Sequence, residues 1–337
     1  MLALSRFPRV DLIHAPTPIQ PLDGLSRSLG DALNGVRLFV KREDIGPVGG
    51  GGNKLRKLEF LLGQARVDGV DTVITVGALQ SNHARLTAAA AARMGFRCEL
   101  FLTRSVSRDD PDYLGNGNRL LHELFGARVH LLAGDADSFD AAQDRARVLR
   151  AEGRRVAVFP SGGSSPLGCL GYAGCAGEIL DQSAAMGLDF AQIVTANGSS
   201  GTHAGLVAGL SALGRDPRIA KSYTVLAPLQ EARRITSEKA EATADLLGVS
   251  LPDDAVVIDG HHRGDGYGIP TEEMLEAVRL MATTEGLLVD PVYSGKAFAG
   301  LLSDVRAGAY RPGDAILFLM TGGVPGLFAY RGAFASA

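Results

Sequence analysis

The stretch "VGGGGNKLRKLE", residues Val48–Glu59, joins four consecutive glycines to the start of a helical pattern. On a helical wheel of about 100° per residue, one apolar face spans an arc of roughly 120° and holds Leu55, Leu58, Leu61, Leu62 and Ala65. Lys54 belongs to this face, Arg56 points to the far side, and Lys57 lies at the edge. A lysine on an apolar face must snorkel to water, pair with an anion or become neutral, and a neutral lysine suits an amine nucleophile or Schiff-base former.

Two glycine-rich phosphate motifs do not match this stretch. The phosphate loop of nucleotide hydrolases needs Ser or Thr after the Gly-Lys pair, but Lys54 follows Asn53 and precedes Leu55. No G-x-G-x-x-G follows an early strand with an acidic residue at the spacing of a dinucleotide fold. Taken alone, Lys54 is also compatible with a snorkelling lysine near a helix start.

Short β-branched runs alternate with longer helical patterns along almost the whole chain. The predicted strands are Val36–Lys41, Thr72–Val76, Cys98–Leu102, Arg128–Leu132, Val156–Phe159, Gln192–Ala196, Tyr223–Ala227 and Ile316–Met320. Helical stretches such as Ala84–Met94 and Gly205–Leu213 are long enough to cross between parallel strands. The alternation predicts an α/β fold with mostly parallel sheet and helices on both faces.

Three turns rich in glycine and serine follow predicted strands and open helices. They are "GALQSNH" (Gly77–His83), "SGGSSPLG" (Ser161–Gly168) and "NGSSGTHAG" (Asn197–Gly205). Each presents free backbone N–H groups at the positive end of a helix dipole. In an open parallel sheet such turns lie where ligands bind, so the three together predict an anionic ligand.

Composition excludes several classes of function. The net charge is 34 − 37 = −3 without a long run of either sign, which argues against nucleic acid or an anionic membrane as partner. No apolar stretch reaches the roughly 18 to 20 residues of a membrane span, and the first residues lack the pattern of a signal peptide. Cys98, Cys169 and Cys175 lack metal-ligand spacing, and the adjacent His261 and His262 cannot converge on a metal, so we expect no metal site. Three unpaired thiols indicate a reducing compartment, the cytoplasm.

Longer motifs, in order along the chain, resemble one enzyme family. They are "GGNKLRKLEF", "GALQSNHARLTAAAAARMG", "YLGNGNRLL", "GTHAGLVAGL", "GYGIP", "EGLLVDPVYSGKAFAGL" and "LFLMTGGVPGLFAY". The chain resembles the pyridoxal-phosphate enzymes of fold type II (tryptophan synthase β-like), in the branch of D-cysteine desulfhydrase and 1-aminocyclopropane-1-carboxylate (ACC) deaminase. The resemblance implies two α/β lobes, each an open and mostly parallel twisted sheet, with pyridoxal 5'-phosphate between them. The small lobe would comprise residues 57–166 and the large lobe residues 1–56 and 167–337, and the family suggests a homodimer.

The resemblance also implies roles for individual residues. Lys54 matches the lysine that holds the cofactor as a Schiff base, and Lys57 a neighbour of the phosphate. The phosphate cup would comprise Gly198, Ser199, Ser200, Gly201 and Thr202. Asn82 matches the asparagine that bonds the phenolic oxygen. Ser294 and Thr321 match residues at the pyridine nitrogen.

On the substrate side, the turn Ser81, Asn82 and His83 matches the site that receives the carboxylate of a small amino acid. Tyr267 and Tyr293 match two active-site tyrosines. Lys54 would remove the α-proton as general base, and Tyr293 or Tyr267 would assist the departure of the β-substituent. Catalysis would therefore depend on Lys54, Ser81, Tyr267 and Tyr293.

The residues that vary within the branch favour a desulfhydrase. ACC deaminases carry a glutamate, which keeps the pyridine nitrogen protonated, where this chain has Ser294. A hydroxyl does not stabilise a pyridinium as a carboxylate does, so the cofactor should be a weaker electron sink, suited to β-elimination. His83 in place of the deaminases' glutamine agrees, whereas Met320 departs from the "HTGG" of desulfhydrases. The alternatives are L-cysteate sulfo-lyase, ACC deaminase and a non-catalytic cofactor-binding protein.

Overall fold

The computed structural model describes residues 2–335. Its strands are β1 (Ile19–Pro21), β2 (Arg37–Arg42), β3 (Thr72–Ala78), β4 (Arg97–Thr103), β5 (Arg128–Leu132), β6 (Val156–Phe159), β7 (Phe190–Asn197), β8 (Ala220–Thr224), β9 (Val257–Asp259) and β10 (Ala315–Met320). Its α-helices are α1 (Asp23–Leu29), α2 (Lys54–Val67), α3 (Asn82–Met94), α4 (Pro111–Gly115), α5 (Asn118–Leu124), α6 (Ser138–Ala151), α7 (Pro166–Ala185), α8 (Gly201–Ala212), α9 (Leu229–Leu247), α10 (Glu272–Glu285), α11 (Ser294–Arg306), α12 (Pro325–Ala329) and α13 (Arg331–Phe334).

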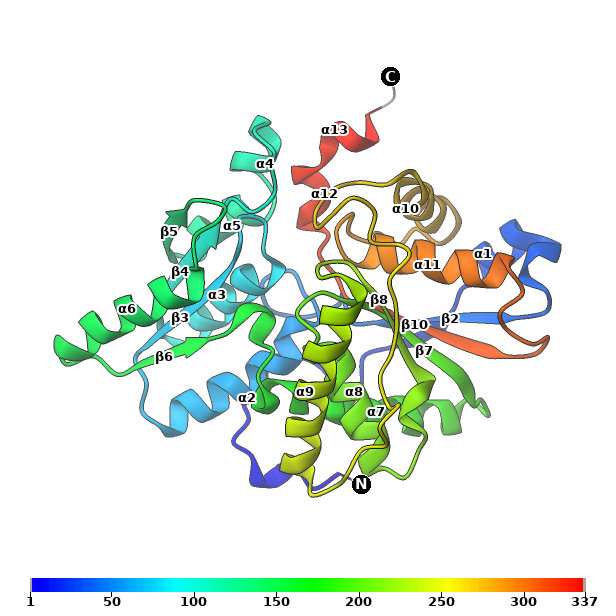
Figure 1. Ribbon diagram of the computed structural model, residues 1–337, viewed down its shortest axis with the longest axis horizontal. Coiled ribbons are helices and arrows are strands. Elements are labelled where there is room, and N and C mark those ends of the chain that lie inside the picture. Colours follow the sequence, from blue (N-terminus) through cyan, green and yellow to red (C-terminus); the bar gives the residue numbers. More distant parts are fainter. Residues whose placement is uncertain (1, 336–337) are drawn as a thin grey trace.

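Two separate sheets divide the molecule into two parts (Figure 1). The larger sheet has six strands in the order β1-β2-β10-β7-β8-β9, and only the edge strand β1 runs antiparallel to its neighbour. The smaller sheet has four strands in the order β5-β4-β3-β6, all parallel. The predicted α/β fold with two mostly parallel sheets is confirmed.

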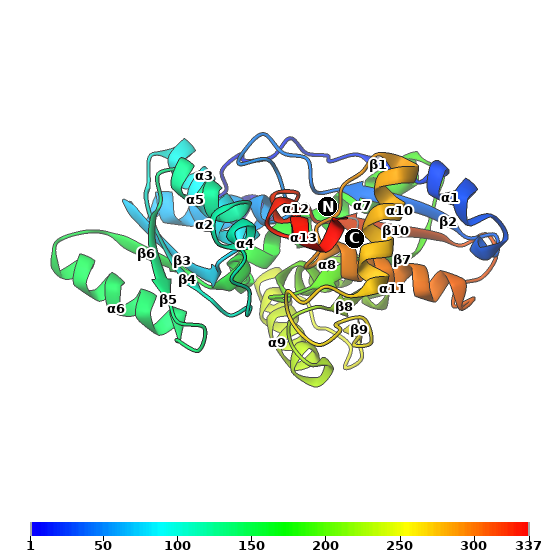
Figure 2. The same cartoon turned by 90° about the horizontal axis from the view of Figure 1, so that it is seen from above.

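Helices cover both faces of each sheet because the strands are apolar on both sides. In the larger sheet, one face packs against α1, α10 and α11, and the other against α7 and α8. In the smaller sheet, α2 and α3 cover one face and α6 covers the other (Figure 2). Burial on both faces explains why these strands appear in the sequence as continuous β-branched runs without polar alternation.

All eight predicted strands are present, with one displaced. The run Tyr223–Ala227 predicts a strand three residues later than β8, which spans Ala220–Thr224. The chain leaves the sheet after Val225 because Thr224 Oγ1 donates to Ala227 O at 2.6 Å and Pro228 caps α9. The sequence did not predict β1 and β9, which have three residues each and little periodicity.

The predicted lobe boundaries at residues 57 and 166 lie outside the strands of the smaller sheet, which span residues 72–159. The larger sheet draws its strands from residues 19–42 and 190–320. The boundaries themselves stay a prediction. What matters for the site is that β3, β6, β7 and β10 each end at one cavity between the two sheets.

Candidate active site

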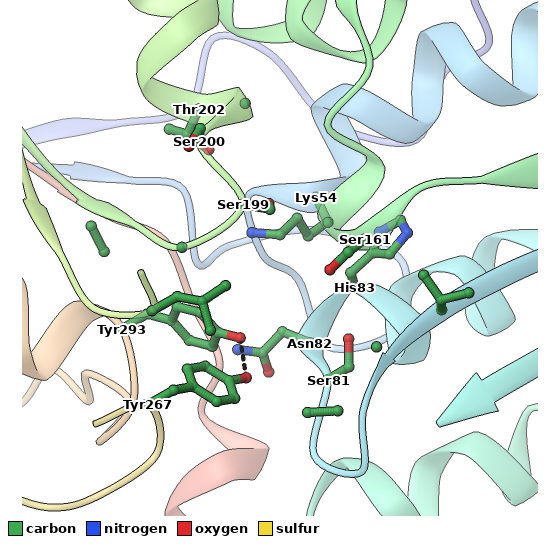
Figure 3. A pocket seen from close by; sticks show the side chains of 18 of the residues that line it. Lys54, Ser81, Asn82, His83, Ser161, Ser199, Ser200, Thr202, Tyr267 and Tyr293 are labelled. Atoms are coloured by element: carbon green, nitrogen blue, oxygen red, sulfur yellow. Dashed lines mark hydrogen bonds between the residues drawn. The ribbon is translucent and has the colours of Figure 1, made fainter. Parts of the chain in front are cut away.

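A cavity of about 340 Å³ lies at the carboxyl ends of strands from both sheets. Its walls contain the glycine-rich turns and most of the predicted site residues (Figure 3). These are Lys54, Lys57, Ser81, Asn82, His83, Gly198, Ser199, Ser200, Gly201, Thr202, Tyr267, Tyr293 and Thr321. Ser294 lies behind this wall, hydrogen-bonded to Thr321. The structure therefore brings together residues that are up to 267 positions apart, Lys54 and Thr321 being the outermost.

The four glycines of the opening stretch shape the loop that leads to Lys54. Gly49, Gly50, Gly51 and Gly52 all have positive φ angles, between 59° and 131°. A Cβ atom on Gly51 would lie 2.0 Å from Asp44 O, so only glycine fits there. The loop ends where Asn53 N donates to Thr321 O at 3.0 Å, and α2 then begins at Lys54.

Lys54 extends from the first residue of α2 into the cavity (Figure 3). Its Nζ donates to Asn53 Oδ1 at 2.9 Å and lies 5.9 Å from the centre of the Tyr293 ring. Burial lowers the pKa of Lys54 to about 8, although the carboxylate of Asp290 raises it, and the guanidinium of Arg85 lowers it further. A substantial fraction of this amine is therefore neutral near physiological pH, as a nucleophile or base requires.

The turn Gly198–Thr202 between β7 and α8 forms an anion cradle. Ser200 has a left-handed backbone with φ of 70°, which turns successive N–H groups to one side at the start of α8. Lys57 Nζ donates to Ser164 Oγ at 2.9 Å, and a Cβ on Gly201 would lie only 2.8 Å from this Nζ. Burial, followed by the charge of Lys54, lowers the pKa of Lys57 well below its usual value.

Sequence reasoning missed Lys239, which reaches the same cradle from α9. Its Nζ donates to Ser199 O at 3.0 Å, and its charge contributes to the lowered pKa of Lys57. Among residues 2–335, Lys54, Lys57 and Lys239 form no ion pair with a carboxylate. Three amines and a helix N-terminus without a counter-charge fit a phosphate monoester. No local pattern could reveal Lys239, since it lies on an ordinary amphipathic helix.

Ser81 and His83 on the β3–α3 turn are held by contacts outside the cavity. Ser81 Oγ caps α3 by accepting from Ala84 N at 3.1 Å, so its own proton is free to donate. His83 Nε2 lies 2.8 Å from Thr75 Oγ1, whose proton goes to Phe159 O at 3.0 Å. Nε2 must therefore be the donor in this contact. Burial, with the charges of Lys54 and Lys57, lowers the pKa of His83 well below 6.5, so the ring is neutral and Nε2 carries its single proton. The ring has no N–H left for a ligand, and what His83 offers the cavity is its backbone N–H in the first turn of α3.

The two tyrosines face Lys54 across the cavity. Their hydroxyl oxygens are 2.5 Å apart and their ring centres 5.8 Å apart. Burial raises the pKa of Tyr267 well above 10, and it also raises the pKa of Tyr293. Both therefore stay protonated at neutral pH and can donate a proton.

Asp290, a second residue that sequence reasoning missed, positions Tyr293. Its carboxylate accepts from the backbone N–H of Val292, Tyr293 and Ser294 at 2.8 to 3.1 Å. Burial raises the pKa of Asp290 to about 6 despite these donors. Asp290 lies in the motif "DPVYSGK", and an Asp four residues before a helix start is the sequence signal that could have identified it.

Thr321 lines the cavity wall at the end of β10, and the hydroxyl of Ser294 on α11 lies behind it. Ser294 Oγ and Thr321 Oγ1 are 2.7 Å apart, and Thr321 N donates to Ser294 Oγ at 3.3 Å. In residues 2–335, no carboxylate hydrogen-bonds either hydroxyl. This wall can exchange hydrogen bonds with a ligand but supplies no negative charge.

Comparisons with known proteins identify a family that covers most of the chain. A family model for pyridoxal-phosphate dependent enzymes matches residues 10–322. The chain is 43% identical over 333 residues to a D-cysteine desulfhydrase of Serratia proteamaculans (strain 568), covering 97% of both chains. It is 42% identical over 328 residues to a D-cysteine desulfhydrase of Salmonella choleraesuis (strain SC-B67), covering 97% of this chain and 98% of the relative.

Two solved structures are similar in three dimensions. A crystal structure of an ACC deaminase homologue aligns with a TM-score of 0.86 at 40% identity, covering 98% of this chain and 96% of the other. A pyridoxal 5'-phosphate-dependent aspartate racemase aligns with a TM-score of 0.64 at 16% identity, covering 91% of this chain and 90% of the other. The second likeness concerns the fold alone.

Proposed function

The chain belongs to the family of pyridoxal-phosphate dependent enzymes, and we propose that it is a carbon–sulfur lyase that converts D-cysteine to pyruvate, ammonia and sulfide. The desulfhydrases at 42–43% identity support this reaction. The observation that carries the choice within the family is the Ser294–Thr321 hydroxyl pair, whose oxygens are 2.7 Å apart and which makes no hydrogen bond to a carboxylate within residues 2–335.

The cofactor site follows from the free donors of the cavity. Lys54 would hold pyridoxal phosphate covalently, and the cradle Gly198–Thr202 with Lys57 would hold its phosphate. Asn82 Nδ2 would donate to the phenolic oxygen, and the Ser294–Thr321 pair would face the ring nitrogen. When bound, the cofactor supplies an electron sink for the charge that develops as a proton leaves the substrate α-carbon.

The protein's own groups perform the remaining steps. The free hydroxyl of Ser81 and the backbone N–H groups of Asn82 and His83 hold the substrate carboxylate at the start of α3. Lys54, whose pKa is about 8, accepts the α-proton as a general base. Tyr293, hydrogen-bonded to Tyr267, gives a phenolic proton to the departing sulfur.

The hydroxyl wall favours elimination over ring opening. An α-carbon that carries no hydrogen requires a strong electron sink, and a pyridine nitrogen beside a carboxylate provides one. Hydroxyls would leave the nitrogen of a bound cofactor neutral, which would weaken the sink but suit prompt loss of a β-substituent. Cysteate is disfavoured because its sulfonate needs a further cation, and the side chains lining the cavity include no arginine.

One panel of substrates tests the proposal. Purified protein with pyridoxal phosphate is given D-cysteine, L-cysteine, L-cysteate and ACC, and the release of sulfide, sulfite, pyruvate and 2-oxobutyrate is measured. We expect sulfide and pyruvate from D-cysteine in equal amounts. Sulfite from L-cysteate as the main product would indicate an L-cysteate sulfo-lyase, and 2-oxobutyrate from ACC would indicate an ACC deaminase. No product from any substrate would indicate a non-catalytic protein.

We also propose that the enzyme is a cytoplasmic homodimer. Cys98, Cys169 and Cys175 are buried free thiols, which supports a reducing compartment. An apolar surface patch on α12, α13 and the segment after α10, comprising Leu288, Leu327, Phe328 and Phe334, supports an interface between two copies. Within residues 2–335, no helix is long and apolar enough to cross a membrane.

A further inference from the structure

Asn118, the first residue of α5, connects two parts of the small lobe without touching the cavity. It is fully buried. Its backbone N–H donates to Gln80 Oε1 at 2.9 Å, and its Nδ2 donates to Gln80 O at 3.0 Å and to Asn82 Oδ1 at 2.8 Å. It belongs to the motif "YLGNGNRLL", for which the proposed mechanism provides no role.

Backbone groups determine the orientation of each side-chain amide in this chain of contacts. Gln80 Nε2 must donate, because it meets two carbonyls, Tyr113 O at 2.6 Å and Asn116 O at 2.9 Å. Gln80 Oε1 must accept, because it meets the N–H of Asn118. Asn118 Nδ2 must face Gln80 O, because the opposite orientation would bring two acceptor oxygens together.

This orientation of Asn118 has a cost and a consequence. Its Oδ1 is buried without a hydrogen-bond donor in residues 2–335, which disfavours the arrangement by itself. Because Nδ2 points at Asn82, the atom of Asn82 that it meets must be the acceptor Oδ1. Asn82 Nδ2 is thereby turned to the other side.

Asn82 Nδ2 is a donor without a protein acceptor. The side chain projects from the start of α3 into the cavity, on the side of the two tyrosines (Figure 3). None of the side-chain hydrogen bonds within residues 2–335 uses this nitrogen, and Asn82 takes part only through Oδ1. The turn of Gly323 lies against it, since a Cβ there would be 2.6 Å from Nδ2.

We propose that Asn118 is a positioning residue that holds the Asn82 amide with its N–H group toward the ring oxygen of the bound cofactor. A donor at this oxygen favours its deprotonated form and strengthens binding, whereas a carbonyl oxygen there favours the protonated phenol. Through Asn82, Asn118 would thus favour the deprotonated form of this oxygen when the cofactor is bound. The proposal rests on cofactor binding but not on the identity of the substrate.

The test replaces the donor of Asn118 by acceptors or by an apolar group. Cofactor-free wild type, Asn118→Asp and Asn118→Leu are titrated with pyridoxal phosphate, and the dissociation constant and the absorbance bands of the bound cofactor are recorded against pH. In Asn118→Asp the carboxylate recruits Asn82 Nδ2, so Oδ1 faces the cavity. We expect about tenfold weaker binding and a shift toward the short-wavelength band of the protonated phenol, with a smaller effect in Asn118→Leu.

His122→Leu is the matched control. His122 lies one turn later on α5, is equally buried, and makes no side-chain hydrogen bond to Gln80, Asn82 or Asn118 within residues 2–335. We expect wild-type affinity and spectrum from it. In an Asn82→Ala background, Asn118→Asp should produce no further change, because it would act only through Asn82.

Wild-type affinity and spectrum in both Asn118 variants would overturn the proposal, and so would an equal shift in His122→Leu. A wild-type protein that binds no pyridoxal phosphate would instead overturn the cofactor assignment. If the variants do not fold, neutron diffraction of the wild-type protein locates the deuterons directly. Deuterons on the Asn82 atom that faces Asn118 would contradict the proposed orientation.

Discussion

At the scale of single residues, environment separates the lysines of this chain by function. Lys41 is paired with Glu178, and Lys221 with Asp304, whereas Lys54, Lys57 and Lys239 have no carboxylate partner within residues 2–335. A buried amine without a counter-charge favours its neutral form or an anionic ligand. Both outcomes enter the proposed function, with Lys54 as the proposed base and Lys57 and Lys239 beside the proposed phosphate cradle.

The lowered pKa of Lys54 predicts how cofactor uptake depends on pH. With a pKa of about 8, about a quarter of the amine is neutral at pH 7.5, against roughly one part in a thousand for an ordinary lysine. The rate at which cofactor-free protein takes up pyridoxal phosphate should rise with pH and level off above pH 8. Stopped-flow absorbance measures this rate, with acetyl-lysine amide as the control, whose rate should still rise near pH 10.

In Lys54→Ala we expect neither the visible absorbance of the bound cofactor nor turnover. Retention of both would contradict the proposed role of Lys54.

Lys239 should contribute to affinity for the phosphate group alone. Lys239→Met removes a cation that donates to Ser199 O at 3.0 Å in the cradle. We expect about tenfold weaker binding of pyridoxal phosphate and unchanged binding of pyridoxal, which lacks the phosphate. Fluorescence titration with both compounds measures the difference, and Lys239→Arg should retain most of the affinity. An equal loss for both compounds would indicate a structural role.

At the scale of elements, α2 is buried on nearly every side. The wheel placed Arg56 opposite the apolar face, and the structure buries that side as well, against α7. A Cβ on Gly171 of α7 would lie 2.2 Å from Arg56 O, so the two helices approach closely. Arg56 bonds Glu43 and Glu178 there at 2.5 to 3.0 Å. This ion network holds the helix that carries Lys54.

Glu43→Gln should destabilise the fold. Burial by itself raises the pKa of Glu43, but the charge and hydrogen bonds of Arg56 and the charge of Lys41 outweigh it and lower the pKa to about 2. Because the folded pKa lies below the unfolded value, the stabilisation is complete above about pH 4.5 and is lost as pH falls toward 2. We expect urea denaturation at pH 7 to show a loss of about 3 kcal/mol in the variant.

The exposed pair Arg306–Glu276 provides the control for that measurement. Glu276→Gln should change the free energy of unfolding by less than about 1 kcal/mol, because solvent screens the pair. If Glu43→Gln and Glu276→Gln lost the same amount, the buried network would not stabilise α2 as we describe.

At the scale of the whole molecule, two sheets share one cavity. The small sheet brings the turn Ser81–His83, and the large sheet brings the cradle Gly198–Thr202, Tyr293 and Thr321. Parallel strands end at the same edge of a sheet, so the loops that follow them gather there. The turn Ser81–His83 and the cradle Gly198–Thr202 come from different sheets, so the cavity exists only where the two sheets meet.

The apolar patch predicts how the molecule associates. Phe328 is 57% exposed and Leu288 42% exposed within it. Phe328→Glu should convert the proposed dimer to a monomer in sedimentation equilibrium, because an interface cannot bury an unpaired carboxylate. Val148→Glu, at an isolated position on α6 with 50% exposure, is the control and should remain a dimer. A monomeric wild-type protein would contradict the proposed dimer, and a dimeric Phe328→Glu variant would place the interface elsewhere.

The sequence alone determined the fold class and the eight longer strands, because β-branched runs, apolar periodicity and glycine turns depend on neighbouring residues. It also placed Lys54 at a helix start, and the reactivity of this lysine stays a prediction. The resemblance added the identity of the cofactor and the residues expected around it. Only the tertiary structure decided which distant groups act on them. Lys239 approaches Ser199 across 40 positions, Lys57 reaches Ser164 across 107, and Asn118 faces Asn82 across 36. Such contacts depend on how helices and sheets pack, and no local pattern in the chain encodes the direction of an amide or the charge near a buried amine.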